Sequence, residues 1–260
     1  MNLSIIIVNY KNKIKIAKCL AAFYAADLTG LNFEVFLVDN ASGDDLSAFA
    51  FYPNLAIINS DKNLGMGGGN NLGLQRAKGE FVLVLNPDAY VSRDAVKILL
   101  NYIKTNNDVA VVGPKLLNSD GSLQYSCANF PQIFTPILRR TFLGDYFKKS
   151  RDSFMMTDFN HDEIAEVDWL MGSCLMIRRC DWSGFDERFF MYFEDIDLCR
   201  NFHVLGKKVI YNPQAVVTHD HQRASAKYPW YQAIFCDALA RHHIKSWLKY
   251  FWKWRGQKTT

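Results

Sequence analysis

The sequence predicts an α/β fold in which the strands of a mostly parallel sheet alternate with helices. The prediction depends on short apolar runs of strand length and on helical periodicity between the first two of them. Residues 3–8 form the first run, and residues 13–24 follow with Ile16, Leu20 and Phe23 at helical spacing. Further continuous apolar runs, typical of strands buried on both faces, lie at residues 33–38, 55–58 and 81–85.

Polar residues directly follow three of these predicted strands. Asn9 follows the first, Asp39 the second, and Asn86-Pro87-Asp88 the fourth. In open α/β sheets, ligands bind beyond the carboxyl ends of the strands. Because Asn86 and Asp88 lie two residues apart, extended backbone points their side chains the same way, and both could share one hard cation. The alternative interpretation is an ordinary Asn-Pro-Asp turn.

A glycine-rich segment, NLGMGGGNN, precedes the strand at 81–85. Its backbone amides, from Gly65 onwards, could approach a phosphate at a helix N-terminus. The segment lacks the Gly-Lys-Ser/Thr of a P-loop and does not follow the first strand as a dinucleotide fingerprint does. A flexible turn is therefore the competing interpretation.

A second acidic signal lies in FFMYFEDIDLCRNF, residues 189–202. Glu194, Asp195 and Asp197 interrupt an aromatic and apolar run, and three neighbouring carboxylates raise one another's pKa when they are buried. Acidic residues also favour the first turn of a helix, and Leu198 and Phe202 follow at helical spacing. The segment is thus either a capped helix or an acidic functional site.

Composition limits the class of protein. With 260 residues, 49% of them hydrophobic, the chain can bury one large core. Its six cysteines contain no C-x-x-C pair and no secretory signal precedes them, which predicts reduced thiols in a cytoplasmic protein. No apolar run approaches the roughly 18 residues of a transmembrane helix. We expect no nucleic-acid partner, because the core lacks a basic stripe and a reader motif.

Taken in order, eight motifs resemble glycosyltransferase family 2, and most closely its bacterial rhamnosyltransferase-type branch. The resemblance covers about residues 2–223 and rests on VNY, VDNAS, NLGMGGGNN, LVLNPDAYV, GPKLLNSDGSLQYS, VDWLMGSCLMIRR, FDERFFMYFEDIDLC and VTH. It implies the GT-A nucleotide-sugar fold, a single Rossmann-like domain with a mixed, mostly parallel sheet. We expect that domain to span residues 1–237.

The resemblance also implies a donor and metal site. In it, Asp39 accepts a hydrogen bond from a pyrimidine base, and Asp88 is the second acid of the metal motif. Asn86 stands where many relatives carry an Asp, so a divalent Mg²⁺ or Mn²⁺ would be held mainly by Asp88, the donor diphosphate and water. His219 matches a third metal position. The remaining positions matched to the donor side are Asn9, Asn63, Gly65 and Gln124, with Arg178 near them.

The same resemblance implies that Asp195 is the catalytic base. Enzymes of this kind invert the anomeric centre in one displacement, so they need one base and no carboxylate nucleophile. Glu194 and Asp197 would then hold acceptor or supporting groups. The segment that would line the acceptor and sugar pocket comprises Asp168, Trp169, Gly172 and Ser173. The alternative for the Trp169 ring is packing in the core.

The resulting prediction is a metal-dependent inverting glycosyltransferase. Its donor would be dTDP-β-L-rhamnose or, alternatively, a UDP-hexose. Its acceptor would be a polyprenyl-diphosphate-linked saccharide or a lipopolysaccharide core. A non-catalytic nucleotide-sugar-binding module is the rival from another class, and the presence of both Asp88 and Asp195 argues against it.

The carboxyl-terminal segment, residues 238–260, predicts a basic amphipathic helix. At about 100° per residue, Arg241, Lys245, Lys249 and Lys253 share one face. The opposite face carries Ile244, Trp247, Leu248, Phe251 and Trp254. Since a lipid-linked acceptor is met at a bilayer, we expect this helix to bind the inner face of the cytoplasmic membrane. The alternative is a helix that docks its aromatic face on the catalytic domain.

Overall fold

The computed structural model describes residues 2–135, 146–220 and 237–256. Within them, ten strands form one sheet, whose main path runs β3-β2-β1-β4-β11-β6-β12-β5. The strands on this path are β1 (Leu3–Asn9), β2 (Phe33–Asp39), β3 (Leu55–Asn59), β4 (Phe81–Leu85), β5 (Ala89–Val91), β6 (Val109–Leu117), β11 (Cys174–Arg178) and β12 (Lys208–His219). β7 (Leu123–Gln124) pairs with β6, β9 (Ala165–Glu166) with β12, and β8 (Cys127–Ala128) with β10 (Trp169–Leu170).

The sheet is mixed and mostly parallel, which confirms the predicted fold class. β1 runs parallel to β2 and β4, β2 to β3, and β12 to β6, whereas β11 is antiparallel to both β4 and β6. The parallel register sets Asn9 opposite Asp39 at one edge of the sheet. The strands predicted at 3–8, 33–38, 55–58 and 81–85 are all present.

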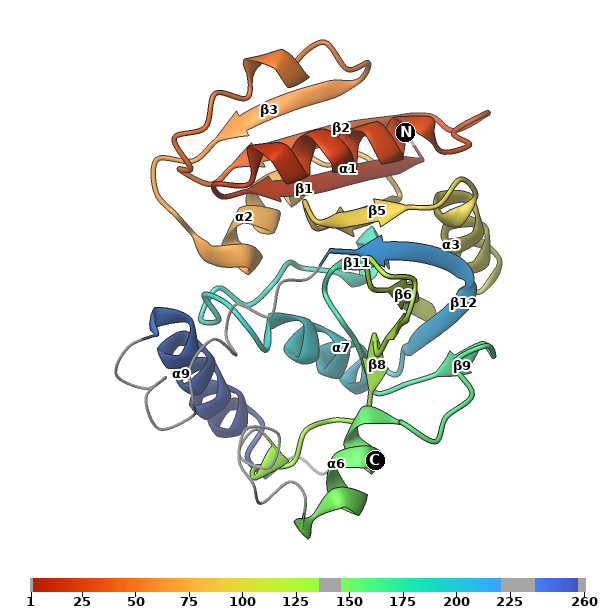
Figure 1. The fold of residues 1–260 in the computed structure, drawn as a ribbon, viewed down its shortest axis with the longest axis vertical. Coiled ribbons are helices and arrows are strands. Elements are labelled where there is room, and N and C mark those ends of the chain that lie inside the picture. Colours follow the sequence, from red (N-terminus) through yellow and green to blue (C-terminus); the bar gives the residue numbers. More distant parts are fainter. Residues whose placement is uncertain (1, 136–145, 221–236, 257–260) are drawn as a thin grey trace.

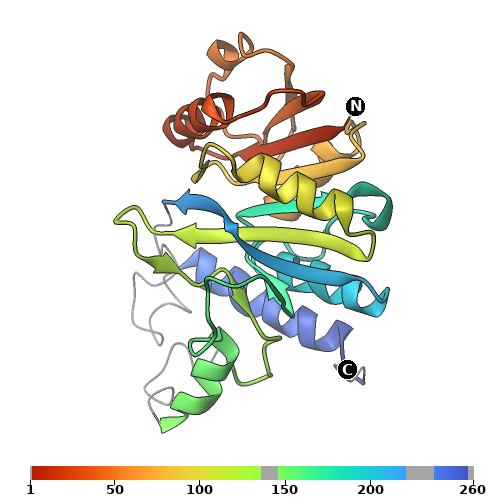
Figure 2. The ribbon, with the colours of Figure 1, turned by 90° about the vertical axis from the view of Figure 1, so that its right-hand side faces the viewer.

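Helices cover both faces of the sheet (Figure 1). The helices of the described residues are α1 (Lys13–Ala25), α2 (Gly65–Leu74), α3 (Ala95–Thr105), α6 (Lys148–Met155), α7 (Glu194–Val204) and α9 (Ala238–Lys253), with short 3-10 turns at Ser47–Phe49 and Arg179–Asp181. Of these, α6 lies away from the main sheet, next to β8. Alternate residues of β1 enter different cores: Ile5 and Ile7 belong to the hydrophobic cluster that includes α1 and α3, and Ile6 belongs to the cluster that includes α7 and α9. In Figure 2, α3 lies on one side of β6 and β12 and α9 on the other.

The glycine-rich segment forms helix α2, not a flexible turn. Its glycines allow close packing: a Cβ on Gly73 would lie 2.5 Å from the Ile6 side chain, and one on Gly69 would lie 2.7 Å from Val8. Gly65 begins the helix with φ of +76°, and a Cβ there would lie 1.9 Å from the carbonyl oxygen of Phe190. Glycine at these positions therefore serves contacts with β1 and with the aromatic segment before α7.

The carboxyl-terminal helix packs on the domain, which corrects the predicted membrane-facing stripe. Tyr250 is fully buried, Trp254 is 6% exposed, and Trp247 and Phe251 pack against the same hydrophobic cluster as α7. The side chains that remain exposed on α9 are Arg241, Lys245, Leu248, Lys249 and Trp252. No helix in the described residues is long and apolar enough to cross a membrane. Residues 257–260 lie outside the described ranges.

Candidate active site

The carboxyl ends of β1 and β2 hold a buried amide beside a carboxylate. Asn9 is fully buried, and its Nδ2 donates to Ser42 Oγ (2.9 Å) and Asp44 Oδ2 (3.0 Å), with Asp39 Oδ1 at 3.5 Å. The same Asp39 oxygen accepts from the backbone N–H of Ser42 at 3.1 Å. Asp39 itself stays partly exposed at the sheet edge. Asn9 therefore orients the loop that presents the Asp39 carboxylate.

A second amide, Asn40, fixes the loop that leads into α2. Its Nδ2 donates to Asn63 Oδ1 and to the carbonyl of Gly65, both at 3.0 Å, and its Oδ1 accepts from Leu64 N at 2.9 Å. The Asn63 side chain in turn accepts from Gly65 N at 2.9 Å. Asn40 was not predicted from the sequence, although it lies inside the VDNAS motif directly after Asp39.

Asp88, after β4, is surrounded by basic groups. Lys15 Nζ lies 3.4 Å from its Oδ2, and His219 Nε2 lies 3.3 Å from its Oδ1. Burial alone would raise the pKa of the Asp88 carboxyl, but the hydrogen bond and charge of His219 and the charge of Lys15 outweigh burial and lower it. Asp88 is thus an ionised carboxylate whose side chain is still 22% exposed.

Gln124 determines which nitrogen of His219 faces Asp88. Gln124 Oε1 lies 2.6 Å from His219 Nδ1, so Nδ1 is the donor in that contact. Gln124 Nε2 donates to Asn118 Oδ1 at 2.9 Å, which keeps the carboxamide oxygen turned towards the imidazole. The His219 Nε2 that faces Asp88 either carries a second proton or offers its lone pair, and the lone pair beside a carboxylate suits a divalent cation.

Two adjacent residues connect the Asn86 end of the site to Asp195. The carbonyl of Ser173 accepts from Asn86 N at 2.8 Å, and Gly172 N donates to Asp195 Oδ2 at 2.9 Å. Gly172 is packed closely against the aspartate, because a Cβ there would lie 3.1 Å from Asp195 Cβ. The structure therefore brings Asn86, Ser173, Gly172 and Asp195 together, although they come from three separate motifs.

Glu194 and Asp195 open α7 directly after a turn of unusual backbone. Tyr192 and Phe193 have φ of 68° and 69°, a left-handed conformation that bulky residues rarely adopt. Burial raises the pKa of the Asp195 carboxyl, although backbone N–H groups of Gly172 and Ile196 oppose the shift. The pKa of Glu194 is raised further, first by burial and then by the Asp195 charge. Asp195 is consequently a stronger base than an ordinary aspartate once it is ionised.

Two polar atoms beside Asp195 have no hydrogen-bond partner among the described residues. They are Ser173 Oγ and Glu194 Oε2, and their residues are 1% and 5% exposed. Buried polar groups are nearly always paired with protein or water. These atoms therefore have hydrogen-bonding capacity that a bound water or substrate hydroxyl can use.

Two residues that were predicted to line the acceptor pocket, Trp169 and Asp168, have other contacts in the structure. Trp169 is 9% exposed, its Nε1 donates to Asn129 O at 2.9 Å, and its ring lies 6.3 Å from that of Phe154. Core packing therefore replaces the predicted sugar-stacking face. Asp168 Oδ2 accepts from Phe130 N at 2.6 Å, so it fixes the chain after β8.

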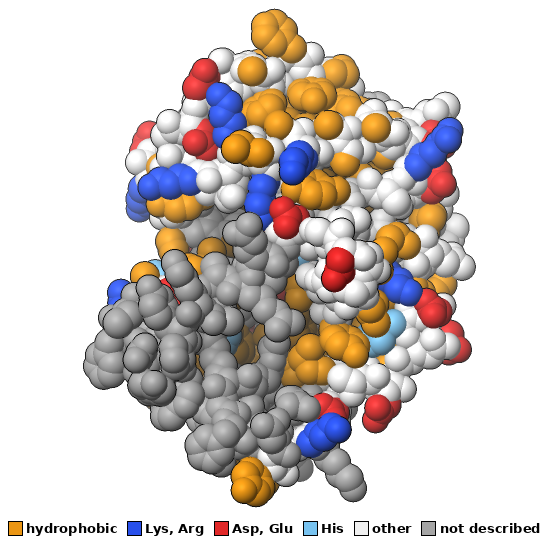
Figure 3. Space-filling view, in the orientation of Figure 1, with side chains coloured by type: hydrophobic (Ala, Val, Ile, Leu, Met, Phe, Trp, Pro, Cys, Tyr) orange, Lys and Arg blue, Asp and Glu red, His pale blue; other side chains and the backbone are white. Residues whose placement is uncertain are grey.

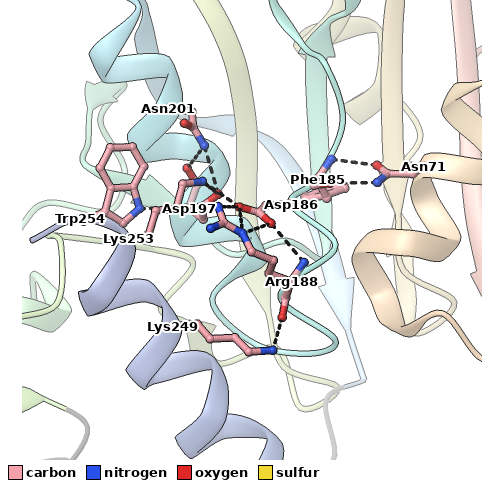
Figure 4. Close-up of polar contacts among 9 residues, drawn as sticks. All are labelled: Asn71, Phe185, Asp186, Arg188, Asp197, Asn201, Lys249, Lys253 and Trp254. Carbon is pink, nitrogen blue, oxygen red and sulfur yellow. Dashed lines mark hydrogen bonds and ion pairs between the residues drawn. The ribbon is translucent and has the colours of Figure 1, made fainter.

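Asp197, which was predicted to hold the acceptor or a supporting group, bonds instead to residues at the end of α9 (Figure 4). It is 1% exposed and accepts hydrogen bonds from Lys253 Nζ (2.7 Å) and Trp254 Nε1 (2.8 Å). This correction follows from helical geometry, since two residues along α7 turn a side chain to a different face. Arg178 also lies elsewhere, at the far end of β11, where it pairs with Phe81 and donates to the carbonyl of Val109.

Known families and sequences include clear relatives of this chain. The model of the family Glycosyl transferase family 2 matches residues 4–161. An N-acetylglucosaminyl-diphospho-decaprenol L-rhamnosyltransferase of Mycobacterium tuberculosis is 27% identical over 266 residues, covering 95% of this chain and 83% of the relative. Rhamnosyltransferase WbbL of Escherichia coli is 27% identical, covering 72% and 69%. The hexosyltransferase Agl10 of Haloferax volcanii is 30% identical, covering 76% and 60%.

Solved structures share the fold. Residues 1–349 of S. aureus TarS in complex with UDP superpose with a TM-score of 0.60 at 21% identity, covering 84% of this chain and 60% of that one. GalNAc-T7 with UDP, GalNAc and Mn²⁺ has a TM-score of 0.65 at 14% identity, covering 86% and 44%. At these identities the likeness establishes the GT-A fold.

Proposed function

The chain belongs to glycosyl transferase family 2 and is a glycosyltransferase, and from that premise we propose that it moves a sugar from a nucleotide donor with inversion of the anomeric carbon. The observation that carries the proposal is the path from Asn86 through Ser173 and Gly172 to Asp195. It connects the predicted donor end of the site to one half-buried carboxylate of raised pKa. In this proposal residues 1–237 carry the reacting groups, and residues 238–260 form a segment that serves them.

Asp195 would act as the base of a single displacement. It takes the proton of the acceptor hydroxyl while that oxygen bonds to the anomeric carbon, and the nucleoside diphosphate leaves with the electrons of the broken C–O bond. The N–H groups of Gly172 and Ile196 each hold one oxygen of Asp195, at 2.9 Å, and so keep the carboxylate oriented. Glu194, whose pKa is raised further, would remain protonated and offer a hydrogen bond to the acceptor.

Asp88 and His219 would hold a divalent cation, Mg²⁺ or Mn²⁺. A carboxylate oxygen and an imidazole nitrogen 3.3 Å apart fit such an ion. The described residues contain no cluster of three or more His, Cys, Asp or Glu side chains that could hold a metal. We therefore propose that donor diphosphate and water complete the ligand set, with Asn86 nearby. When bound, the cation neutralises charge on the departing diphosphate.

We propose dTDP-β-L-rhamnose as the donor, because two of the relatives are named rhamnosyltransferases. Asp39 would accept a hydrogen bond from the pyrimidine base, and Asn9, Asn63 and Gly65 would shape the loops around it. The alternative is a UDP-hexose, since TarS was solved with UDP and with UDP-GlcNAc. Calorimetry with Mg²⁺ should find that dTDP binds at least as well as UDP. A strong preference for UDP would remove rhamnose as the donor.

The acceptor would be a lipid-linked saccharide, as the name of the mycobacterial relative describes for that protein, or a lipopolysaccharide core. Such an acceptor places the enzyme at the inner face of the cytoplasmic membrane. The exposed side of α9 suits this surface, because Trp252 (70% exposed) and Leu248 (57%) lie beside Arg241 and Lys245. This surface keeps Arg241, Lys245 and Leu248 from the prediction made from the sequence, and it adds Trp252 in place of the buried aromatic residues.

Sedimentation with vesicles tests the membrane proposal. Replacing both Trp252 and Leu248 by Ala should release the protein from vesicles that contain anionic lipid, and neutral vesicles should bind it weakly. Phe51→Ala is the matched control, because Phe51 is 91% exposed and far from α9 in the sequence. Unchanged binding of the double variant would reject this surface.

The decisive experiment for the proposed function is a panel of nucleotide sugars assayed for release of nucleoside diphosphate. We expect one donor to be consumed in the presence of Mg²⁺ or Mn²⁺, with faster release when acceptor is added. A non-catalytic nucleotide-sugar-binding module would bind a donor and release no nucleoside diphosphate from any of them. That result would overturn the assignment of Asp195 as a base.

A further inference from the structure

Two polar side chains of α9, one buried and one exposed, donate hydrogen bonds to the segment that precedes Asp195. Ser246 Oγ donates to the carbonyl of Met191 at 2.8 Å, and Lys249 Nζ donates to the carbonyl of Arg188 at 2.6 Å. Each bond is made to a main-chain carbonyl, so it orients the backbone of the segment directly. Two successive turns of α9 thus bind two points of the same loop.

Imidazole rings of α9 cover the turn itself. His242 stacks on Phe190 with ring centroids 4.6 Å apart and an interplanar angle of 28°. His243 lies 5.0 Å from the Tyr192 ring and 5.4 Å from the Phe193 ring. Tyr192 and Phe193 are the two left-handed residues of this turn, so the His243 ring of α9 contacts the side chains of residues whose backbone conformation costs free energy.

The last turn of α9 joins both ends of this segment (Figure 4). Lys253 Nζ lies 3.0 Å from Asp186 Oδ2 and 2.7 Å from Asp197 Oδ2, and Trp254 Nε1 donates to Asp197 Oδ1. Asp197 lies two residues after Asp195 on α7, and Asp186 lies before the turn. One lysine therefore ties the entrance of the turn to the first turn of α7.

Helix α2 holds the same segment from the opposite side. Asn71 accepts from Phe185 N at 2.8 Å and donates to Phe185 O at 2.9 Å, as Figure 4 shows. Met66 N donates to Phe190 O at 3.1 Å, and Gly65 leaves no room for a side chain against that carbonyl. The segment from Phe185 to Asp197 is therefore held between α9 and α2, the helix that follows the loop fixed by Asn40.

We propose that α9 is a positioning element for the catalytic base: by holding residues 190–193 in their left-handed turn, it places Asp195 against Gly172 N–H. The proposal rests on the proposed function, because it assigns α9 a role only if Asp195 takes the acceptor proton. α9 touches no reacting atom in this account. Its effect on catalysis passes through the geometry of one carboxylate, and small displacements of a reacting group lower rates strongly.

The test compares two variants on α9 with a matched control. Ser246→Ala removes the bond to Met191 O, and Lys253→Met removes both ion pairs at the last turn. Lys97→Met is the control, because Lys97 pairs with Asp27 at 2.6 Å, is 27% exposed and belongs to α3. We expect kcat to fall about tenfold in each α9 variant, with donor affinity and KM for the donor within about twofold of wild type. The control should keep wild-type kcat.

A double-mutant cycle separates positioning from general destabilisation. In an Asp195→Asn background the base is already absent, so Ser246→Ala should lower kcat no further. An equal loss in both backgrounds, or a wild-type kcat in a folded Ser246→Ala variant, would overturn the proposal. If Lys253→Met does not fold, Ser246→Ala decides alone. Failure of the proposed function is distinct, because the wild-type enzyme itself would then release no nucleoside diphosphate.

Discussion

Asp88 and Asp195 are the same residue type at two ends of one site, and their surroundings are opposite. Asp88 has Lys15 and His219 within 3.4 Å, and these basic groups hold its pKa below the usual value despite burial. The carboxylate of Asp195 is held by backbone N–H groups of Gly172 and Ile196, and burial raises its pKa. Asp88 is thus stabilised as an anion, whereas the surroundings of Asp195 make it a stronger base.

This difference shows how one residue type serves two chemical roles. A ligand for a cation must stay ionised and accessible, which suits a partly exposed carboxylate beside basic groups. A general base must gain a proton in the reaction, which a desolvated carboxylate does more readily. The contrast predicts different responses to metal, to substitution and to pH at the two aspartates.

Removing the metal should have the largest effect and act at the Asp88 end alone. EDTA should abolish transfer and Mg²⁺ or Mn²⁺ should restore it, because the departing diphosphate depends on a bound cation. Asp88→Ala should weaken binding of donor and metal together, as calorimetry would measure, and His219→Ala should show a milder defect. Full activity in chelator, with unchanged donor binding in Asp88→Ala, would reject this half of the comparison.

Removing the base should affect the rate and spare binding. Asp195→Asn keeps shape and hydrogen bonding, so kcat should fall by roughly a hundredfold or more, as loss of a general base typically does. Donor affinity should stay near the wild-type value. Steady-state kinetics and donor titration measure the two quantities separately. Wild-type turnover would transfer the role to Glu194, since Asp197 is occupied by α9.

The Gln124 carboxamide should matter at the Asp88 end through His219. Gln124→Leu removes the acceptor that selects the Nδ1–H form of the imidazole, so metal affinity should fall by roughly 10- to 100-fold. Titration of Mn²⁺ in the presence of donor measures this loss. Gln214→Leu is the control, because Gln214 is an exposed glutamine on β12, the strand that ends in His219. Equal affinities in the two variants would contradict the assignment.

The smallest effect is expected at Glu194 and depends on pH. Because the pKa of Asp195 is raised above its ordinary value of 3.8, kcat should fall on acidification at a higher pH than for an ordinary aspartate.

Glu194→Gln mimics the protonated acid, so kcat should change by only about threefold. A carboxyl whose folded pKa is raised contributes its full stability only below its ordinary pKa of 4.5, and that stability is lost as the pH rises towards the folded pKa. The Gln side chain cannot ionise, so this variant should melt at a higher temperature than wild type at pH 8 and at the same temperature at pH 4. If wild type and variant melt at the same temperature at both pH values, ionisation of Glu194 does not destabilise the fold.

The sequence by itself determined the sheet and the polar residues at its edge. Continuous apolar runs require burial on both faces, and the polar residue after each run must lie where the strand leaves the core. This local logic placed Asn9, Asp39 and Asp88, and helix-start chemistry placed Glu194 and Asp195 at the first turn of α7. The assignment of donor and base roles to them remains a prediction.

Only the tertiary structure decided what the neighbouring aromatic and charged residues contact. Trp169, Asp197 and the aromatic residues of the apolar stripe on α9 have the composition of a sugar platform, an acceptor ligand and a membrane anchor, yet they pack against the domain. An amphipathic pattern predicts that an apolar surface is buried, but it does not predict what covers that surface. The protein core, a lipid bilayer and a ligand all remove apolar surface from water. Likewise the run of glycines specified close approach, and only the fold showed that Phe190 and β1 lie there.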